Sequence, residues 1–217
     1  MSKLKLVGWA SAHAVFFVQQ SWLLLASSFC FGLLIAMTNT ALSGRIEQNK
    51  AARLNDLTKA LLPGAEVFQP VAADIQVSLP DGSKEKARVF EVLSRDQQRI
   101  GWSFNAHGVG FAGPIELVLA VDKDFQKIMG FDVLASSETP GFGDQIRSGF
   151  YRKQYADAPA EPLSLVKMGD PALADAQIVA ITGATVSSQA VVNIVNTFLT
   201  QIKSQMQEKG LIGNVRQ

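Results

Sequence analysis

Thr185 is the residue of this chain best placed to carry chemistry. It ends the small segment Thr182-Gly183-Ala184-Thr185, and an amphipathic helix is expected to begin directly after it, at Val186. Backbone N–H groups and the positive end of the helix dipole favour a bound anion at such a position. The hydroxyl could therefore carry a phosphate. It could also simply cap the helix, as could the hydroxyl of Thr182.

A second polar segment runs from Ser137 to Asp144, with the sequence SETPGFGD. Its Pro140-Gly141 pair favours a type II turn, in which glycine supplies the positive φ. Glu138 and Thr139 offer a carboxylate and a hydroxyl beside backbone amides, and this loop could hydrogen-bond the edge of a heteroaromatic ring. The alternative interpretation is the start of a helix, with Asp144 as its capping residue.

A third segment, His107 to Glu116, contains Gly108, Gly110 and Gly113. Glycines at this density let the backbone approach a ligand or another chain segment closely. The simpler interpretation is a tight connection between two pairs of strands.

Several kinds of site are not supported by the sequence. His107 is the sole histidine after residue 44, which argues against a histidine-based metal site in the soluble domain, and we predict neither catalytic residues nor metal ligands. The one cysteine, Cys30, lies in an apolar run, so neither an intrachain disulfide nor a thiolate-bound iron–sulfur cluster is expected. Nucleotide-binding glycine motifs are lacking, and a net charge of +1 over 217 residues does not suggest a nucleic-acid surface.

The N-terminal region, residues 1–44, is predicted to contain a membrane anchor. From Trp22 to Leu42 the sequence is mostly apolar and uncharged, and a helix needs about 20 such residues to cross a bilayer. A cleavable signal peptide is the alternative, but Lys3 and Lys5 lie far from the apolar run, which is also long for such a peptide. Positive charges near the two ends slightly favour the C-terminal domain inside.

The rest of the chain is expected to form a linking helix over residues 45–64, ended by Pro63-Gly64, and one domain over residues 65–217. The pattern predicts strands at Ala87–Leu93, Ile100–Asn105, Ile115–Asp122 and Lys127–Leu134. Asp144–Tyr155 could be helical. A further helix is predicted at Val186–Met206, with an apolar stripe of Val191, Ile194, Val195, Phe198, Ile202 and Met206. This order indicates an α+β domain with antiparallel strands and flanking helices.

Taken in order, the anchor, the linking helix, the GPIE strand, the SETPGFGD loop and the TGAT segment resemble a known family. It is the FMN-binding domain shared by the G subunit of the Rnf electron-transport complex and the C subunit of the sodium-pumping NADH:quinone reductase. The resemblance covers nearly the whole chain, and the compact spacing is more similar to the Rnf G subunit. In one departure, Val179 stands where the family's motif often has an aspartate.

The resemblance implies that FMN is bound to Thr185 through a phosphoester, installed by a flavin transferase that uses FAD. Further residues would bind the cofactor: near the ring Glu138, Thr139, Pro140 and Gly141, and beside the attachment point Thr182, Gly183, Ala184 and Val186.

The implied function is that of a membrane-anchored flavoprotein subunit. It would relay electrons through FMN in an ion-translocating ferredoxin:NAD oxidoreductase, beside membrane and iron–sulfur subunits, with no independent catalytic site. The domain would face the periplasm or cell exterior at the bacterial inner membrane, and we prefer this to the charge count. One alternative is the C subunit of the quinone reductase. Another is a cofactor-free membrane-anchored assembly or binding module, in which TGAT only caps a helix.

Overall fold

The structure is a computed structural model of the chain. It describes the backbone of residues 3–213, and the surroundings of the side chains from residue 20 onward except at residue 47. The chain divides into two compact units, Met1–Asn49 and Lys50–Gln217, which are described separately.

The first unit is a single helical stretch, the longer part of α1 (Lys3–Leu61). The helix continues through Ser43 and Gly44 without a break. Its large apolar side chains from Trp22 onward are exposed, and this stretch is long and apolar enough to cross a membrane. The hydroxyls of Thr38 and Thr40 donate to carbonyls one turn earlier, at 2.7 and 2.9 Å. These polar groups therefore need no water, which suits a lipid environment.

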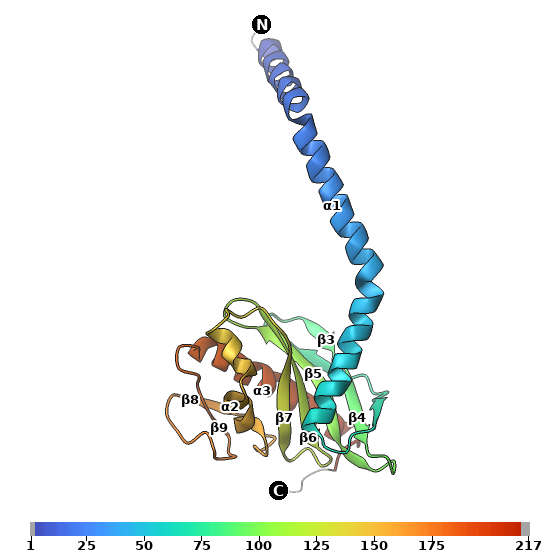
Figure 1. The fold of residues 1–217 in the computed structure, drawn as a ribbon, viewed down its shortest axis with the longest axis vertical. Coiled ribbons are helices and arrows are strands. Elements are labelled where there is room, and N and C mark those ends of the chain that lie inside the picture. Colours follow the sequence, from blue (N-terminus) through green and yellow to red (C-terminus); the bar gives the residue numbers. More distant parts are fainter. Residues whose placement is uncertain (1–2, 214–217) are drawn as a thin grey trace. The chain divides into compact units, whose positions relative to one another are not determined.

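The second unit is built on a five-stranded antiparallel sheet with the order β1-β4-β5-β6-β7 (Figure 1). Its strands are β1 (Val67–Pro70), β4 (Val89–Leu93), β5 (Arg99–Val109), β6 (Pro114–Asp122) and β7 (Ile128–Ser136). The last four correspond to the four predicted strands. However, β5 is longer than expected, because His107 and Gly108 pair with Glu116 and Ile115 of β6. Placing these two residues in a connection was wrong, and the turn itself begins only at Gly110.

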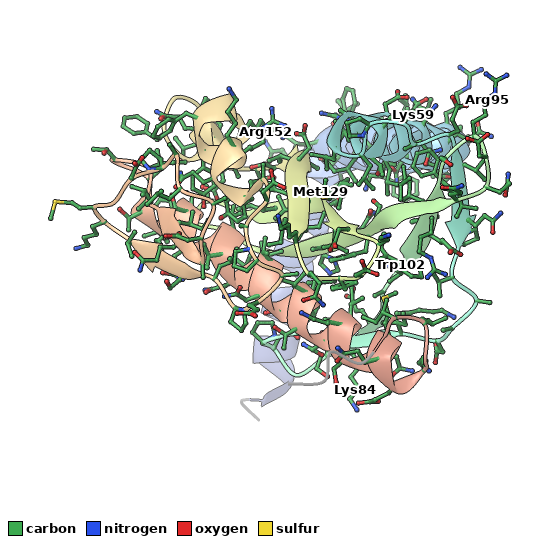
Figure 2. All side chains as sticks on the ribbon, turned by 90° about the horizontal axis from the view of Figure 1, so that it is seen from below. Lys59, Lys84, Arg95, Trp102, Met129 and Arg152 are labelled. Carbon is green, nitrogen blue, oxygen red and sulfur yellow. The ribbon has the colours of Figure 1, made fainter. Side chains whose placement is uncertain are left out.

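Strand β6, which lies between β5 and β7, is buried on both faces. Leu117, Leu119 and Val121 belong to the main core, which they share with α3 (Thr185–Glu208). Val118 and Ala120 point to the other face, where they pack near the last turns of α1. Figure 2 shows these turns, marked by Lys59, and α3 on opposite sides of the sheet. Burial on both faces explains the almost continuous apolar run of this strand.

The last turns of α1 are part of the domain core. Leu54 packs with Val118 and Leu134, and the hydroxyl of Thr58 lies 2.9 Å from that of Ser103, with both residues fully buried. The helix expected as a linker therefore belongs to the compact domain from Lys50 onward. A sheet with two apolar faces needs a cover on each, and α1 supplies the second one.

The predicted C-terminal helix is present as α3, and all six residues of its apolar stripe are buried. Its far end also closes the edge of a small hairpin, β2 (Gln76–Ser78) and β3 (Lys84–Lys86). The side-chain amides of Gln201 and Gln205 each donate to and accept from the backbone of one β2 residue, at 2.6–3.0 Å. These amides take the place of a neighbouring strand.

The remaining elements are short. The helix considered at Asp144–Tyr155 is divided into η1 (Gly143–Arg147), α2 (Gly149–Arg152) and η2 (Lys153–Tyr155). Ser148 causes the interruption, since its backbone is extended and its side chain accepts a hydrogen bond from the N–H of Tyr151. Asp144 lies inside η1 and caps none of the three helices. Two parallel strands, β8 (Ser164–Val166) and β9 (Gln177–Val179), complete the domain.

Candidate functional site

Three segments that are far apart in the sequence meet around one hollow of about 480 Å³. They are the turn between β5 and β6, the loop after β7, and the segment that begins α3 (Figure 1). These are the three segments that the sequence singles out. The volume lies in the range of about 300–1,000 Å³ that is usual for small-molecule sites.

Most of the predicted site residues line this hollow, namely Glu138, Thr139, Gly183, Ala184, Thr185 and Val186. Pro140, Gly141 and Thr182 lie in the same loops but outside the lining, on the surface. The structure adds Phe111, Phe142, Gly143 and Ser187. Phe111 and Gly143 lie in glycine-containing segments that the sequence already marks as candidates for a site. Ser187 has the sequence context of an ordinary helical residue.

Thr185 is the first residue of α3, and its side chain is exposed. Ala184 occupies the N-cap position, and no side chain accepts a hydrogen bond there. The interpretation of Thr182 or Thr185 as a helix cap is therefore wrong. Gly183 has a φ of +81°, a backbone conformation that residues with a side chain rarely adopt. This positive φ explains why the segment contains a glycine. The hydroxyl of Thr185 lies exposed at the N-terminus of α3.

The backbone beneath Thr185 is held by Ser188. Its hydroxyl donates to the carbonyl of Ala184 at 2.9 Å and accepts from the N–H of Ile181 at 3.1 Å. The Tyr151 hydroxyl donates to the Ser188 carbonyl at 3.0 Å and lies 2.8 Å from the Tyr155 hydroxyl. Burial raises the pKa of both tyrosines well above the usual value, so both stay protonated. Since Tyr151 donates to Ser188, the proton between the two rings comes from Tyr155.

Glu138 is bonded within the protein rather than left free for a ligand. It is 6% exposed, and its Oε1 accepts from the N–H groups of Phe111 and Ala112 at 2.6 and 3.2 Å. Its Oε2 accepts from the hydroxyl of Ser187 at 2.7 Å. From the sequence, we expect this carboxylate to bind the edge of a ring. In the structure it connects the loop after β7 to the two other segments of the site.

The rim of the hollow is apolar, and the end of the hollow at Thr185 favours an anion. Phe111 and Phe142 are 69% and 63% exposed, and Val186 is also exposed. The first turn of α3 contains no acidic residue that would compete with an anion. The unpaired N–H groups of this turn and the helix dipole attract a phosphate. A flat aromatic ring linked to a phosphate therefore fits the residues present.

Comparison with known proteins agrees with this geometry. The family described as FMN-binding domain matches residues 110–200, a range that includes all three segments of the site. The G subunit of the ion-translocating oxidoreductase complex of Methanosarcina acetivorans is 30% identical over 79% of this chain and 87% of its own length. The chain belongs to this G-subunit family.

Further matches lie in the same family or share its fold. The G subunit of the proton-translocating ferredoxin:NAD(+) oxidoreductase complex of Clostridium ljungdahlii is 28% identical over 80% of this chain and 85% of its own length. The crystal structure of the C subunit of the Na(+)-translocating NADH-quinone reductase from Parabacteroides distasonis is 21% identical. It covers 73% of this chain and 95% of its own, with a TM-score of 0.51. The expected family and the α+β fold are thus confirmed.

Proposed function

We propose that this protein is a membrane-anchored electron carrier with FMN bound covalently to Thr185. It relays electrons within an ion-translocating ferredoxin:NAD oxidoreductase complex. The observation that carries the proposal is the exposed Thr185 hydroxyl, which lies at the N-terminus of α3 and at the edge of a hollow. The names of the G-subunit relatives support the assignment to such a complex.

Each part of the site has a task toward FMN. The first turn of α3 binds the phosphate through its N–H groups and its dipole. Phe111, Phe142 and Val186 flank the ring and exclude water from it. Thr139 and the backbone of the loop after β7 offer hydrogen bonds to its polar edge. The flavin supplies the redox chemistry when bound, so the protein needs no acid, base or nucleophile of its own.

The covalent bond fits a domain on the outer side of the membrane. There a freely dissociating FMN would be lost by dilution, whereas a phosphoester retains it. The exposed apolar half of α1 supports a single-pass anchor. We place the domain on the periplasmic or external side of the bacterial inner membrane, with a flavin transferase for maturation and iron–sulfur subunits as partners. The 21% identity to the C subunit of a quinone reductase supports the fold alone, so the G-subunit role is preferred.

The proposal is tested with the full chain, co-expressed with a flavin transferase. Denaturing electrophoresis under ultraviolet light and the intact mass detect a covalent flavin. We expect both signals in the wild type, and neither in Thr185→Ala. Thr200→Ala changes an exposed threonine on the same helix and should keep the flavin. A wild-type chain without any flavin would contradict the proposal and favour a cofactor-free assembly module.

A further inference from the structure

The Glu138 carboxylate occupies a space that two glycines, Gly110 and Gly143, keep open. A Cβ atom on Gly110 would clash with its Oε1, and one on Gly143 would clash with its Oε2. A Cβ on Gly113 would lie 2.7 Å from that of the adjacent Ser137. Gly110 and Gly143, which belong to two separate loops, are therefore needed because the buried Glu138 side chain passes between them.

The carboxylate is stabilised by neutral donors. Its partners are two backbone N–H groups and the hydroxyl of Ser187, which lies in the first turn of α3. Over residues 20–46 and 48–213, no ion pair of Glu138 with a lysine, arginine or histidine is present. A glutamine could keep the same contacts, since its oxygen can accept from the two N–H groups and its amide can donate to the hydroxyl.

These contacts hold the Phe111 wall of the hollow at a fixed distance from the helix turn that begins with Thr185. Phe111, whose N–H is bonded to Oε1, carries one wall of the hollow. Ser187, bonded to Oε2, lies one residue beyond Val186 on the helix turn that begins with Thr185. One side chain thus connects the ring wall to the turn that holds the attachment point.

We propose that Glu138 is a positioning residue, which fixes the Phe111 wall relative to Thr185 and acts on bound FMN only through these two residues. The inference rests on the proposed function, because it assumes a flavin in the hollow. It differs from a direct contact between this carboxylate and the ring, since the shape of the side chain matters and its charge does not.

The test compares Glu138→Ala with Glu138→Gln in the flavin-loaded full chain, with Glu161→Ala as a control at an exposed carboxylate. Hydrogen exchange measured by mass spectrometry reports on the peptide that contains Phe111 and Ala112. Iodide quenching reports on access to the flavin. In Glu138→Ala we expect both exchange and quenching to rise severalfold, because two N–H groups lose their acceptor and the wall moves. Glu138→Gln and Glu161→Ala should match the wild type in both measurements.

Ser187→Ala provides a milder change if Glu138→Ala does not fold. It removes only the Oε2 contact, and we expect a smaller rise in quenching with unchanged covalent attachment. The proposal is overturned if Glu138→Gln alters iodide quenching of the flavin as much as Glu138→Ala, or if exchange at Phe111 and Ala112 is unchanged in Glu138→Ala. If the wild type carries no flavin, the proposed function fails, and the exchange measurement alone decides whether Glu138 positions the turn.

Discussion

Side chains at both ends of α3 hold neighbouring segments by hydrogen bonds, but only the first turn also presents an exposed threonine hydroxyl at the hollow. At the far end, Gln201 and Gln205 pair with the backbone of β2 and close an edge of the fold. In the first turn, Ser187 and Ser188 hold neighbouring loops, while the hydroxyl of Thr185 remains exposed. One helix therefore stabilises the domain at one end and presents a reactive group at the other. Substitutions along it should separate these two properties.

The largest effect on stability is expected at the far end, from Ile202→Ala. Ile202 is fully buried in the main core, and such a truncation costs about 2–5 kcal/mol of unfolding free energy. Urea unfolding of the detergent-solubilised chain measures the loss. The molecules that remain folded should still carry the covalent flavin. If they lose the flavin selectively, the two ends are not independent.

Gly143→Ala should have the next largest effect, because its Cβ would clash with Glu138 and lie 2.8 Å from the Ser187 hydroxyl. Overpacking of this kind costs about 1–3 kcal/mol. It should also increase iodide quenching of the flavin. Gly149→Ala is the matched control, since nothing lies within 4 Å of its added Cβ. Equal effects of the two substitutions would argue against a crowded carboxylate.

Gln205→Ala removes two hydrogen bonds to Gln76 and should cost about 1 kcal/mol. Hydrogen exchange at β2 should become faster, while the absorption and quenching of the flavin stay unchanged. Gln207→Ala, one residue beyond the buried Met206, serves as a control near the same helix end. A change in the flavin signals would show that the far end of α3 also shapes the site.

The smallest effect on stability is expected from Thr185→Ala. The side chain is exposed and makes no capping bond, so the change in unfolding free energy should stay within about 0.5 kcal/mol. The comparison uses wild-type chain produced without flavin transferase, so that neither protein carries FMN. All covalent flavin should nevertheless be lost when the transferase is present. A large loss of stability would mean that Thr185 supports the helix.

The parts of the fold with a local pattern were predictable. The apolar stripe of α3 repeats with the helical period, and the strands β4 to β7 are bounded by polar or glycine-containing turns. Short elements such as β2 and β8 were not predictable, because three residues carry no measurable period. The extension of β5 through His107 and Gly108 was missed for another reason. Its ladder with β6 outweighs the low strand preference of glycine.

By itself, the sequence determined the order of the main strands and helices, the long apolar N-terminal segment and the placement of Thr185 at a helix N-terminus, because these follow from local composition and spacing. Only the tertiary structure decided what Glu138 contacts and where the end of α1 packs. Both depend on segments far apart in the chain: Glu138 meets the turn between β5 and β6 and the start of α3, and Leu54 meets β6 and β7. A buried carboxylate must be hydrogen-bonded, and its donors are those that the fold brings close to it. The residues beside it in the sequence do not indicate which donors these are.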